Sequence, residues 1–310
     1  MTFATGAGTA SGTVVRPTQS GASLPGALVI AGSGPTDRNG DQSGFVTGTL
    51  RAVSQMLARA GVVSLRYDKL GSGATGAGTV TDPATVTVDT YADQARAALR
   101  TLAGSTGVDP ARLVVVGHSE GSLFAQILAT QPASDGPRPA RLALLMPLAL
   151  RYLDLIATQI TAQLVAATAL GRLGTEQAAT IRAQLDAAVA ATRAGTPAPE
   201  LDPTIAPLSA PANAAFLRTA DALDPVALAR ATPAGVPVLV VCGTDDVQVD
   251  CADAAVLAGA VPSGAGRLVQ VRGVSHVLKV DDSGNPGRYT APLPYSGQVE
   301  RSLRDALTWP

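Results

Sequence analysis

Short runs of apolar and β-branched residues alternate along the chain with segments whose apolar residues recur at helical spacing. The apolar and β-branched runs predict buried strands, and the segments with helical spacing predict amphipathic helices. Asp89 is expected to cap the helix that ends at residue 103. Strands separated by helices of this length favour a mostly parallel sheet flanked by helices, which is an α/β fold. The predicted strands are residues 12–17, 27–31, 62–67, 113–117, 142–146, 237–242 and 267–272, and the predicted helices are residues 47–60, 89–103, 119–130 and 298–307.

The alternation stops between residues 148 and 230, where no segment has a strand pattern. Two segments, residues 152–170 and 175–193, have helical spacing, and a proline-rich stretch follows them. We therefore expect residues 148–230 to form a helical cap, or lid, inserted into an α/β core of residues 1–147 and 231–310. A helical subdomain that lies away from the functional site is the alternative.

The composition narrows the possible partners and cofactors. Lysine and arginine total 23 against 24 acidic residues, so no basic surplus can neutralise phosphates, and we expect no nucleic-acid partner. The two histidines and two cysteines lack the usual ligand spacings, and we expect no metal and no cofactor. No apolar run reaches the ~18 residues of a membrane helix, so no membrane span is expected.

The cellular compartment stays open at this stage. Residues 1–13 have neither the basic nor the apolar stretch of a signal peptide, which fits a cytoplasmic protein or an exported mature form. A disulfide between Cys242 and Cys251 is possible if the protein is exported. Two free thiols, with Cys242 buried in a strand, fit equally well.

A serine stands at the centre of Gly117-His-Ser-Glu-Gly121, which fits the pattern G-x-S-x-G. The pattern follows the apolar run 113–116 and opens the helical segment 119–130. A strand, a tight turn and a helix with serine at the turn make a nucleophile elbow, in which the glycines permit a strained backbone. We predict Ser119 as a nucleophile at the carboxyl end of the sheet, beside the positive end of a helix. A buried serine in an ordinary turn is the alternative.

A serine hydroxyl needs a neighbouring base near neutral pH, and the chain has two histidines. His118 is adjacent to the serine in a tight turn, so its side chain is expected to point elsewhere and to pack as a structural residue. His276 follows the predicted strand 267–272 and is the predicted base.

The base needs a carboxylate to orient its ring and stabilise its cation. Asp245 and Asp246 both follow the predicted strand 237–242, and position alone does not choose between them. Asp250 fits better as the N-cap of the next helix. The order serine, aspartate, histidine along the chain is that of α/β-hydrolases.

An oxyanion formed by attack on a carbonyl needs two backbone donors. One is expected from Glu120, the residue after the nucleophile. The other is expected from the loop Gly32-Ser-Gly-Pro35, with Ser33 as the predicted donor and Gly34 as the next choice. Gly32 and Gly34 are small enough for the backbone to approach the substrate and are predicted to bind it. A plain Gly-Pro turn is the alternative.

Six segments carry a family resemblance: Gly32-Ser-Gly-Pro-Thr-Asp-Arg-Asn-Gly40, Arg66-Tyr-Asp-Lys-Leu-Gly71, Gly117-His-Ser-Glu-Gly121, Asp224-Pro225, Gly243-Thr-Asp-Asp-Val-Gln-Val249 and Gly273-Val-Ser-His-Val-Leu-Lys279. Over nearly its whole length the sequence resembles the bacterial α/β-hydrolase esterases with a Gly-Ser-Gly-Pro loop. The resemblance implies the α/β-hydrolase fold and carboxylesterase activity, and it implies Asp246 as the acid, with Val249 in register. Leu70 and Pro147 depart from the family pattern at the expected pocket rim.

These observations predict a serine carboxylesterase that hydrolyses short- to medium-chain esters through an acyl-enzyme, with a small-molecule ester as its partner. The same serine, acid and histidine also fit a thioesterase or acyltransferase, or an amide or peptide hydrolase. A non-catalytic ligand-binding protein on the same fold is the alternative from another class.

Three further signals have structural interpretations. Gly71-Ser-Gly-Ala-Thr-Gly76 imitates a nucleotide-binding pattern but does not open a helix, so we expect a flexible loop near the cleft. Asp68 is expected to cap the turn at the end of its strand. Tyr152 and Tyr289 are expected to pack at the pocket rim.

Overall fold

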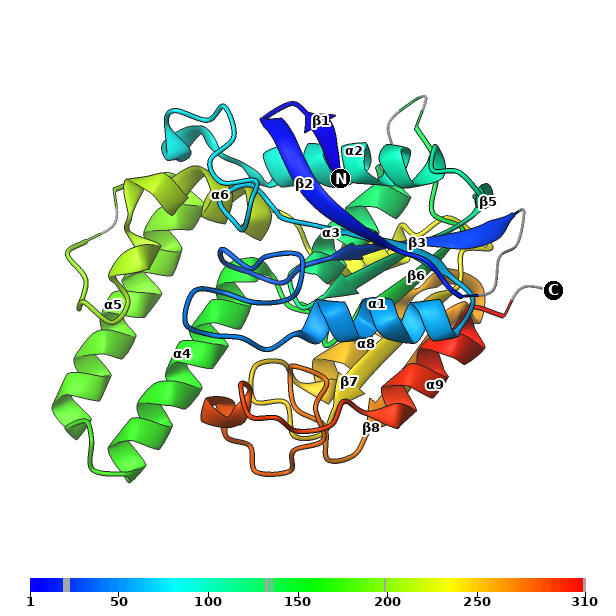
Figure 1. Cartoon of the computed structure of the whole chain (residues 1–310). Coiled ribbons are helices and arrows are strands. Elements are labelled where there is room, and N and C mark those ends of the chain that lie inside the picture. Colours follow the sequence, from blue (N-terminus) through cyan, green and yellow to red (C-terminus); the bar gives the residue numbers. More distant parts are fainter. Residues whose placement is uncertain (19–22, 132–133, 135, 198, 309–310) are drawn as a thin grey trace. The chain divides into compact units, whose positions relative to one another are not determined.

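The computed structural model describes residues 1–18, 23–131, 134, 136–197 and 199–308. These residues divide into two compact units, both drawn in Figure 1. The sheet unit comprises Met1–Thr79, Tyr91–Ala149 and Pro225–Pro310. The helical unit comprises Val80–Thr90 and Leu150–Asp224.

The strands of the sheet unit form a single sheet. They are β1 (Thr2–Thr5), β2 (Gly8–Val15), β3 (Leu24–Ile30), β4 (Val63–Tyr67), β5 (Val108–His118), β6 (Arg141–Leu145), β7 (Val238–Gly243) and β8 (Gly266–Val271). Their order across the sheet is β1-β2-β4-β3-β5-β6-β7-β8. β2 is antiparallel to β1 and β4, whereas the other neighbours run parallel, so the predicted mostly parallel sheet is confirmed.

The central strands are buried on both faces, so most of their residues are apolar, although β4 also buries Ser64 and Arg66. β1 was not predicted from the sequence. Phe3 is its only buried residue, so apolar and polar positions hardly alternate along it. The strand is held by a hairpin with β2, in which Thr5 pairs with Gly8. A hydrophobic pattern cannot indicate a strand that has a single apolar anchor.

Helices cover both faces of the sheet (Figure 1). On one face, α1 (Thr49–Arg59) packs on β3 and β4 and contacts α9 (Gly297–Ala306). On the other face, α7 (Pro225–Arg230) contacts both α3 (Gly121–Thr130) and α8 (Cys251–Ala260). Short 3₁₀ helices complete the secondary structure of both units: η1 (Pro83–Thr85), η2 (Ala206–Leu208), η3 (Pro262–Gly264) and η4 (Pro286–Arg288).

Two predicted helix caps had different outcomes. Asp250 caps α8 and accepts a hydrogen bond from the backbone N–H of Ala252, as predicted. The prediction for Asp89 was wrong, because α2 (Val88–Ala103) begins one residue earlier and places Asp89 in its first turn. A carboxylate there still interacts favourably with the positive end of the helix.

The helical unit is built from α4 (Tyr152–Ala169), α5 (Thr175–Ala194) and α6 (Pro211–Asp221). Its core includes Ile181, Leu185 and Ile205. Tyr152 packs edge-on against the ring of Phe216, with ring centroids 5.4 Å apart. The sequence had indicated only a proline-rich stretch where α6 forms. Proline is accommodated there because Pro211 lies in the first turn, where no intrahelical N–H is needed.

The carboxylate of Asp221 joins three helices of the helical unit. Its buried carboxylate accepts hydrogen bonds from Arg151, from Arg193 and from the backbone N–H of Leu153. Burial alone would raise the pKa of Asp221, but the hydrogen bonds from Arg193 and Leu153 hold that pKa below its usual value. The end of α6 is thereby joined to the first turn of α4 and the last turn of α5.

Candidate active site

Ser119 lies between β5 and α3 with a backbone φ of 55°, a conformation that is rare for a residue with a side chain. Its N–H donates to the carbonyl oxygen of Leu145, which fixes the turn against β6. A Cβ on Gly117 would lie 2.3 Å from the carbonyl oxygen of Gly121, and a Cβ on Gly121 would lie 2.3 Å from that of Ile30. Both glycines of the motif are therefore required by space, and the strained turn holds Ser119 in place.

The structure brings His276 and Asp246 together. Nδ1 of His276 lies 2.7 Å from Oδ2 of Asp246, and both side chains are buried. The other oxygen of Asp246 accepts hydrogen bonds from the backbone N–H groups of Gln248 and Val249. With Nδ1–H donating to the carboxylate, the neutral imidazole presents Nε2 as an acceptor.

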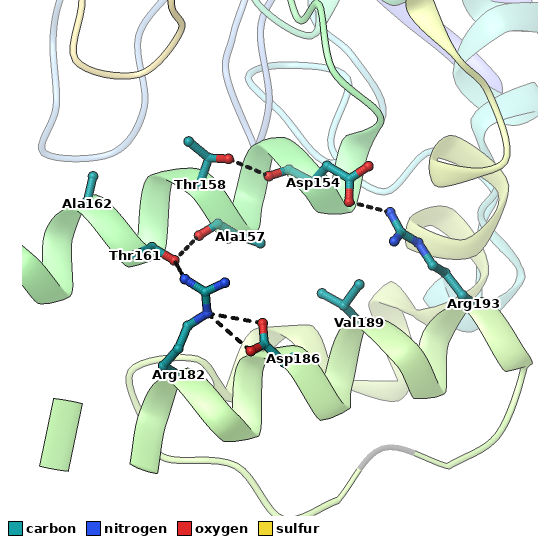
Figure 2. Close-up of a pocket in the computed structure, with 9 residues that line it drawn as sticks. All are labelled: Asp154, Ala157, Thr158, Thr161, Ala162, Arg182, Asp186, Val189 and Arg193. Atoms are coloured by element: carbon teal, nitrogen blue, oxygen red, sulfur yellow. Dashed lines mark hydrogen bonds and ion pairs between the residues drawn. The ribbon is translucent and has the colours of Figure 1, made fainter. Parts of the chain in front are cut away.

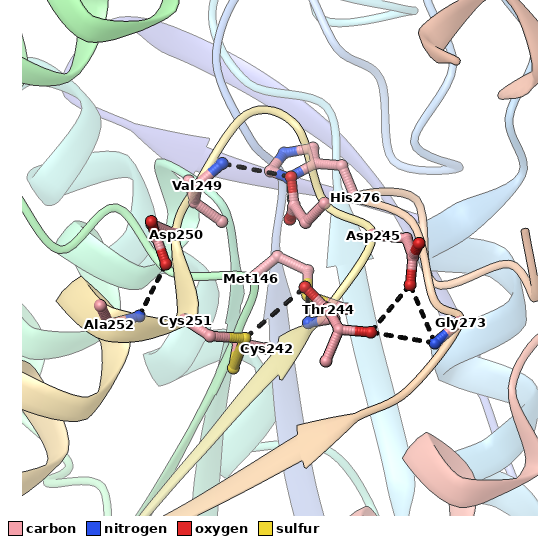
Figure 3. The surroundings of a disulfide bond; sticks show 12 residues. Met146, Cys242, Thr244, Asp245, Val249, Asp250, Cys251, Ala252, Gly273 and His276 are labelled. Carbon is pink, nitrogen blue, oxygen red and sulfur yellow. Dashed lines mark hydrogen bonds and ion pairs between the residues drawn. A yellow bond between two sulfur atoms is a disulfide. The ribbon is translucent and has the colours of Figure 1, made fainter. Parts of the chain in front are cut away.

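The neighbouring carboxylate, Asp245, has different partners. It accepts hydrogen bonds from the hydroxyl of Thr244 and from the backbone N–H of Gly273, at 2.8 and 3.0 Å (Figure 3). Its side chain therefore joins the loop after β7 to the loop after β8. Of the two adjacent aspartates, Asp246 is the one that contacts the histidine.

His118 is hydrogen-bonded as predicted, but it also lies beside the site, where it lines the same cavity as Ser119 and His276. Nε2 of His118 donates to the backbone carbonyl oxygen of His276 at 2.8 Å, and the two rings lie 5.0 Å apart. Burial and, to a lesser extent, the neighbouring His276 lower the pKa of His118 to about 4. His118 thus stays neutral near pH 7 and supports the backbone of His276.

The depressed pKa of His118 predicts a loss of stability in acid. Below pH 6.5 the unfolded chain binds a proton at this histidine, whereas the folded chain does not until about pH 4. The free energy of unfolding therefore decreases as the pH falls from 6.5 to about 4, and this histidine accounts for up to about 3 kcal/mol of the decrease. Urea unfolding of wild type and His118→Gln across this pH range measures the effect. We expect a shallower dependence in the variant, and parallel curves would contradict the assignment.

A disulfide between Cys242 and Cys251 links the end of strand β7 to the first residue of α8 (Figure 3). It answers the question that the sequence left open. The bridge encloses the loop 243–250, which carries Asp246. The position of this carboxylate is therefore limited both by covalent closure of its loop and by the hydrogen bonds to Gln248 and Val249.

Removal of this bridge is expected to destabilise the protein. A closed loop of this size stabilises the folded state by about 2–3 kcal/mol, chiefly by restricting the unfolded chain. Cys242→Ala/Cys251→Ala is expected to lower the Tm by several degrees and kcat by less than about tenfold, since Asp246 keeps its backbone donors. Dithiothreitol should reproduce both changes in wild type and alter nothing in the double variant. An unchanged Tm in fully reduced wild type would contradict this expectation.

The loop 32–48 is held by carboxylates. Asp68 accepts hydrogen bonds from the backbone and side chain of Arg38 and from the N–H of Ala74, which confirms its predicted role at the strand-end turn. Asp41 accepts from the N–H groups of Thr47 and Gly48. The loop thus has a defined path beside Ser119, and a Cβ on Gly32 would lie 3.1 Å from the Cβ of Ser119.

A cavity of about 100 Å³ contains Ser119 and His276. Gly32 and Ser33 also line it, whereas the predicted residues Gly34 and Glu120 are not among its lining residues. Tyr289 forms part of the wall, and burial, with the nearby Asp246 carboxylate, raises the pKa of Tyr289 to about 12. The sequence had not indicated several polar and aromatic wall residues: Thr36, Gln42, Phe45, Thr47, Thr49 and Gln248.

A second, larger cavity of about 630 Å³ lies wholly within the helical unit, between α4 and α5 (Figure 2). Its charged residues pair with one another: Arg182 with Asp186, and Arg193 with Asp154. These charges are compensated, and no nucleophile beside a base lines this cavity. Ser119 and His276, by contrast, line the smaller cavity together.

In the described part of the chain, no three His, Cys, Asp or Glu side chains gather in a way that could hold a metal ion. No helix formed by the described residues combines the length and apolar character needed to span a bilayer.

The chain belongs to the alpha/beta hydrolase family, whose model matches residues 27–285. Among solved structures, Est1E from Butyrivibrio proteoclasticus with ferulic acid bound has a TM-score of 0.60 at 16% identity, covering 99% of this chain and 96% of that one. The enol-lactonase from Burkholderia xenovorans LB400 has a TM-score of 0.57 at 19% identity, with 100% of both chains covered. A thermophilic esterase from Thermogutta terrifontis has a TM-score of 0.57 at 16% identity, with 99% and 97% covered.

At these identities the structural likeness shows the fold. The predicted α/β-hydrolase fold, with a mostly parallel sheet and inserted helices, is confirmed. No curated protein matches the chain.

Proposed function

We propose that this chain is a serine carboxylesterase acting on short-chain esters through an acyl-enzyme. The observation that carries the proposal is the contact of His276 with Asp246 at 2.7 Å, in a cavity that the strained Ser119 also lines. The resemblance to bacterial esterases with a Gly-Ser-Gly-Pro loop, and the esterases among the structural neighbours, support the choice of esters.

In the first half of the reaction, Nε2 of His276 takes the proton of the Ser119 hydroxyl as its oxygen attacks the ester carbonyl carbon. The Asp246 carboxylate holds the ring through Nδ1 and stabilises the imidazolium. The backbone N–H groups of Ser33 and Glu120 donate to the oxyanion of the tetrahedral intermediate. The intermediate collapses as the ester C–O bond breaks and His276 gives its proton to the departing alkoxide, which leaves an acyl group on Ser119.

In the second half, a water molecule attacks the acyl carbon and gives a proton to His276. The bond between the acyl carbon and the serine oxygen then breaks, and that oxygen takes the proton back from His276. The free acid leaves, and the sum of the two halves is an ester and water converted to an acid and an alcohol.

The size of the cavity supports short acyl groups. At about 100 Å³ it is well below the ~300–1,000 Å³ of typical ligand pockets. Gln42 and Gln248 in its wall offer amide groups, which do not favour a long alkyl chain. Acetyl to butyryl esters are therefore the expected substrates, at the short end of the range that the sequence predicted.

A p-nitrophenyl ester series from acetate to dodecanoate tests the proposal, alongside acetyl-CoA and an aminoacyl nitroanilide. We expect kcat/KM to be highest for acetate to butyrate and to fall by tenfold or more at dodecanoate. Faster thioester cleavage would favour the thioesterase or acyltransferase alternative, and faster nitroanilide cleavage the amide hydrolase. Absence of turnover on every substrate would favour a binding protein.

A further inference from the structure

The sheet unit contains a buried ion pair beside the site that sequence reasoning did not indicate. Nζ of Lys69 lies 2.9 Å from Oε1 of Glu120, and the two side chains are only 3% and 4% exposed. Nζ also donates to the backbone carbonyl oxygen of Gly32. Lys69 follows the end of β4, and the ring of Tyr91 lies 5.7 Å from its Nζ. One ammonium group therefore joins the segment before Ser33 to the residue after Ser119.

Stability of the fold does not explain why this ion pair is buried. Removing two charges from water costs several kcal/mol, and apolar residues of similar volume often stabilise a protein as well or better. Lys69 and Lys279 are also the only two lysines in the chain, so cations elsewhere on this protein are arginines. The burial of Lys69 with a carboxylate and a carbonyl as partners therefore indicates a role other than stabilising the fold.

The partners of Lys69 are the two segments that carry the proposed oxyanion donors. The carbonyl group of Gly32 and the N–H group of Ser33 belong to the same peptide unit. A charged donor on that carbonyl fixes the plane of the peptide and polarises it, which makes the N–H a stronger donor. The other partner, Glu120, bears the second proposed donor on its own backbone. Neither Lys69 nor Glu120 lines the cavity, so any influence on the substrate must pass through these peptides.

We propose that Lys69, held by Glu120, is a positioning residue of the oxyanion hole, which orients and polarises the Gly32–Ser33 peptide for transition-state binding. This inference rests on the proposed esterase function. It assigns no contact with substrate to the lysine. Its effect is expected in the transition state, where charge develops on the carbonyl oxygen, and not in ground-state binding.

Lys69→Met tests the inference, because it removes the charge and the donors while keeping the length of the side chain. We expect kcat on p-nitrophenyl acetate to fall about 100-fold, as when one oxyanion donor is lost, with KM changed by less than about threefold. The Ki of a trifluoromethyl ketone, whose serine adduct carries an oxyanion, should rise by a similar factor. Lys69→Arg should recover part of both losses.

Arg141→Met is the matched control. Arg141 also donates to backbone carbonyls, those of Ala306 and Thr308, but it lies at the amino end of β6, away from Ser119. Its loss is expected to leave kcat and the ketone Ki unchanged. If Lys69→Met does not accumulate as folded protein, Glu120→Gln carries the test, with an expected fall in kcat of about tenfold at constant KM.

The outcomes separate this inference from the proposed function. A folded Lys69→Met or Glu120→Gln whose kcat and ketone Ki equal those of wild type overturns the inference and leaves the esterase intact. A loss confined to KM, or a fall in kcat without a change in the ketone Ki, overturns it too. Wild-type protein that neither cleaves esters nor binds the ketone overturns both the function and the inference.

Discussion

Ser119→Ala is expected to lower kcat for p-nitrophenyl acetate by about 10⁵- to 10⁶-fold, because no acyl-enzyme can form without the hydroxyl. The residual rate would come from the remaining oxyanion donors and from substrate binding. The substitution removes a single oxygen at a turn whose conformation is set by Gly117 and Gly121, so the fold should persist. Steady-state kinetics, with circular dichroism to verify folding, measure the effect.

Ser54→Ala is the matched control for that experiment. Ser54 is a fully buried serine in α1 whose hydroxyl has no hydrogen-bond partner among the described residues. Its removal should leave kcat and KM unchanged. A Ser119→Ala variant that keeps more than about 1% of wild-type kcat would contradict the role of this serine as the nucleophile.

The second large effect is expected at Asp246. Asp246→Asn should lower kcat by about 10⁴-fold, because an amide nitrogen facing Nδ1 of His276 forces the imidazole into the wrong tautomer. The other side-chain atom of the asparagine can still accept from the N–H groups of Gln248 and Val249, so the loop should keep its shape.

Asp245→Asn is the natural comparison, since it makes the same chemical change at the next residue. Asp245 bonds Thr244 and Gly273 rather than the histidine, and kcat is expected to stay within about threefold of wild type. Kinetics of both variants on one ester at pH 8 decide the matter. A larger loss at Asp245 would move the acid by one residue and contradict the assignment made here.

The sequence predicted those elements whose hydrophobic pattern is locally complete. β3, β4, β6 and β7 are mostly apolar segments between turn residues, and each was found within a few residues of its expected bounds. β1 and α6 were missed for different reasons. β1 has one buried side chain and exists through its partner strand, and α6 begins at a proline in a stretch whose composition indicates a loop.

The sequence likewise predicted some parts of the candidate site and left others open. The nucleophile motif is local, because a strand, two glycines and a helix are contiguous around Ser119. The choice between Asp245 and Asp246 depends on which carboxylate faces a histidine 30 residues away along the chain, and the residues alone left it open. The role of Lys69 was not predictable either, since one of its partners is a backbone carbonyl of another loop. Every residue has such a carbonyl, so the sequence does not indicate this contact.

Covalent labelling is the most direct test that Ser119 is activated by His276. Wild type, Ser119→Ala and His276→Ala are treated with a fluorophosphonate, and the modified peptide is identified by mass spectrometry. We expect one adduct per chain on Ser119 in wild type, and none in either variant over the same interval. An adduct on a different residue, or equal labelling of wild type and Ser119→Ala, would contradict it.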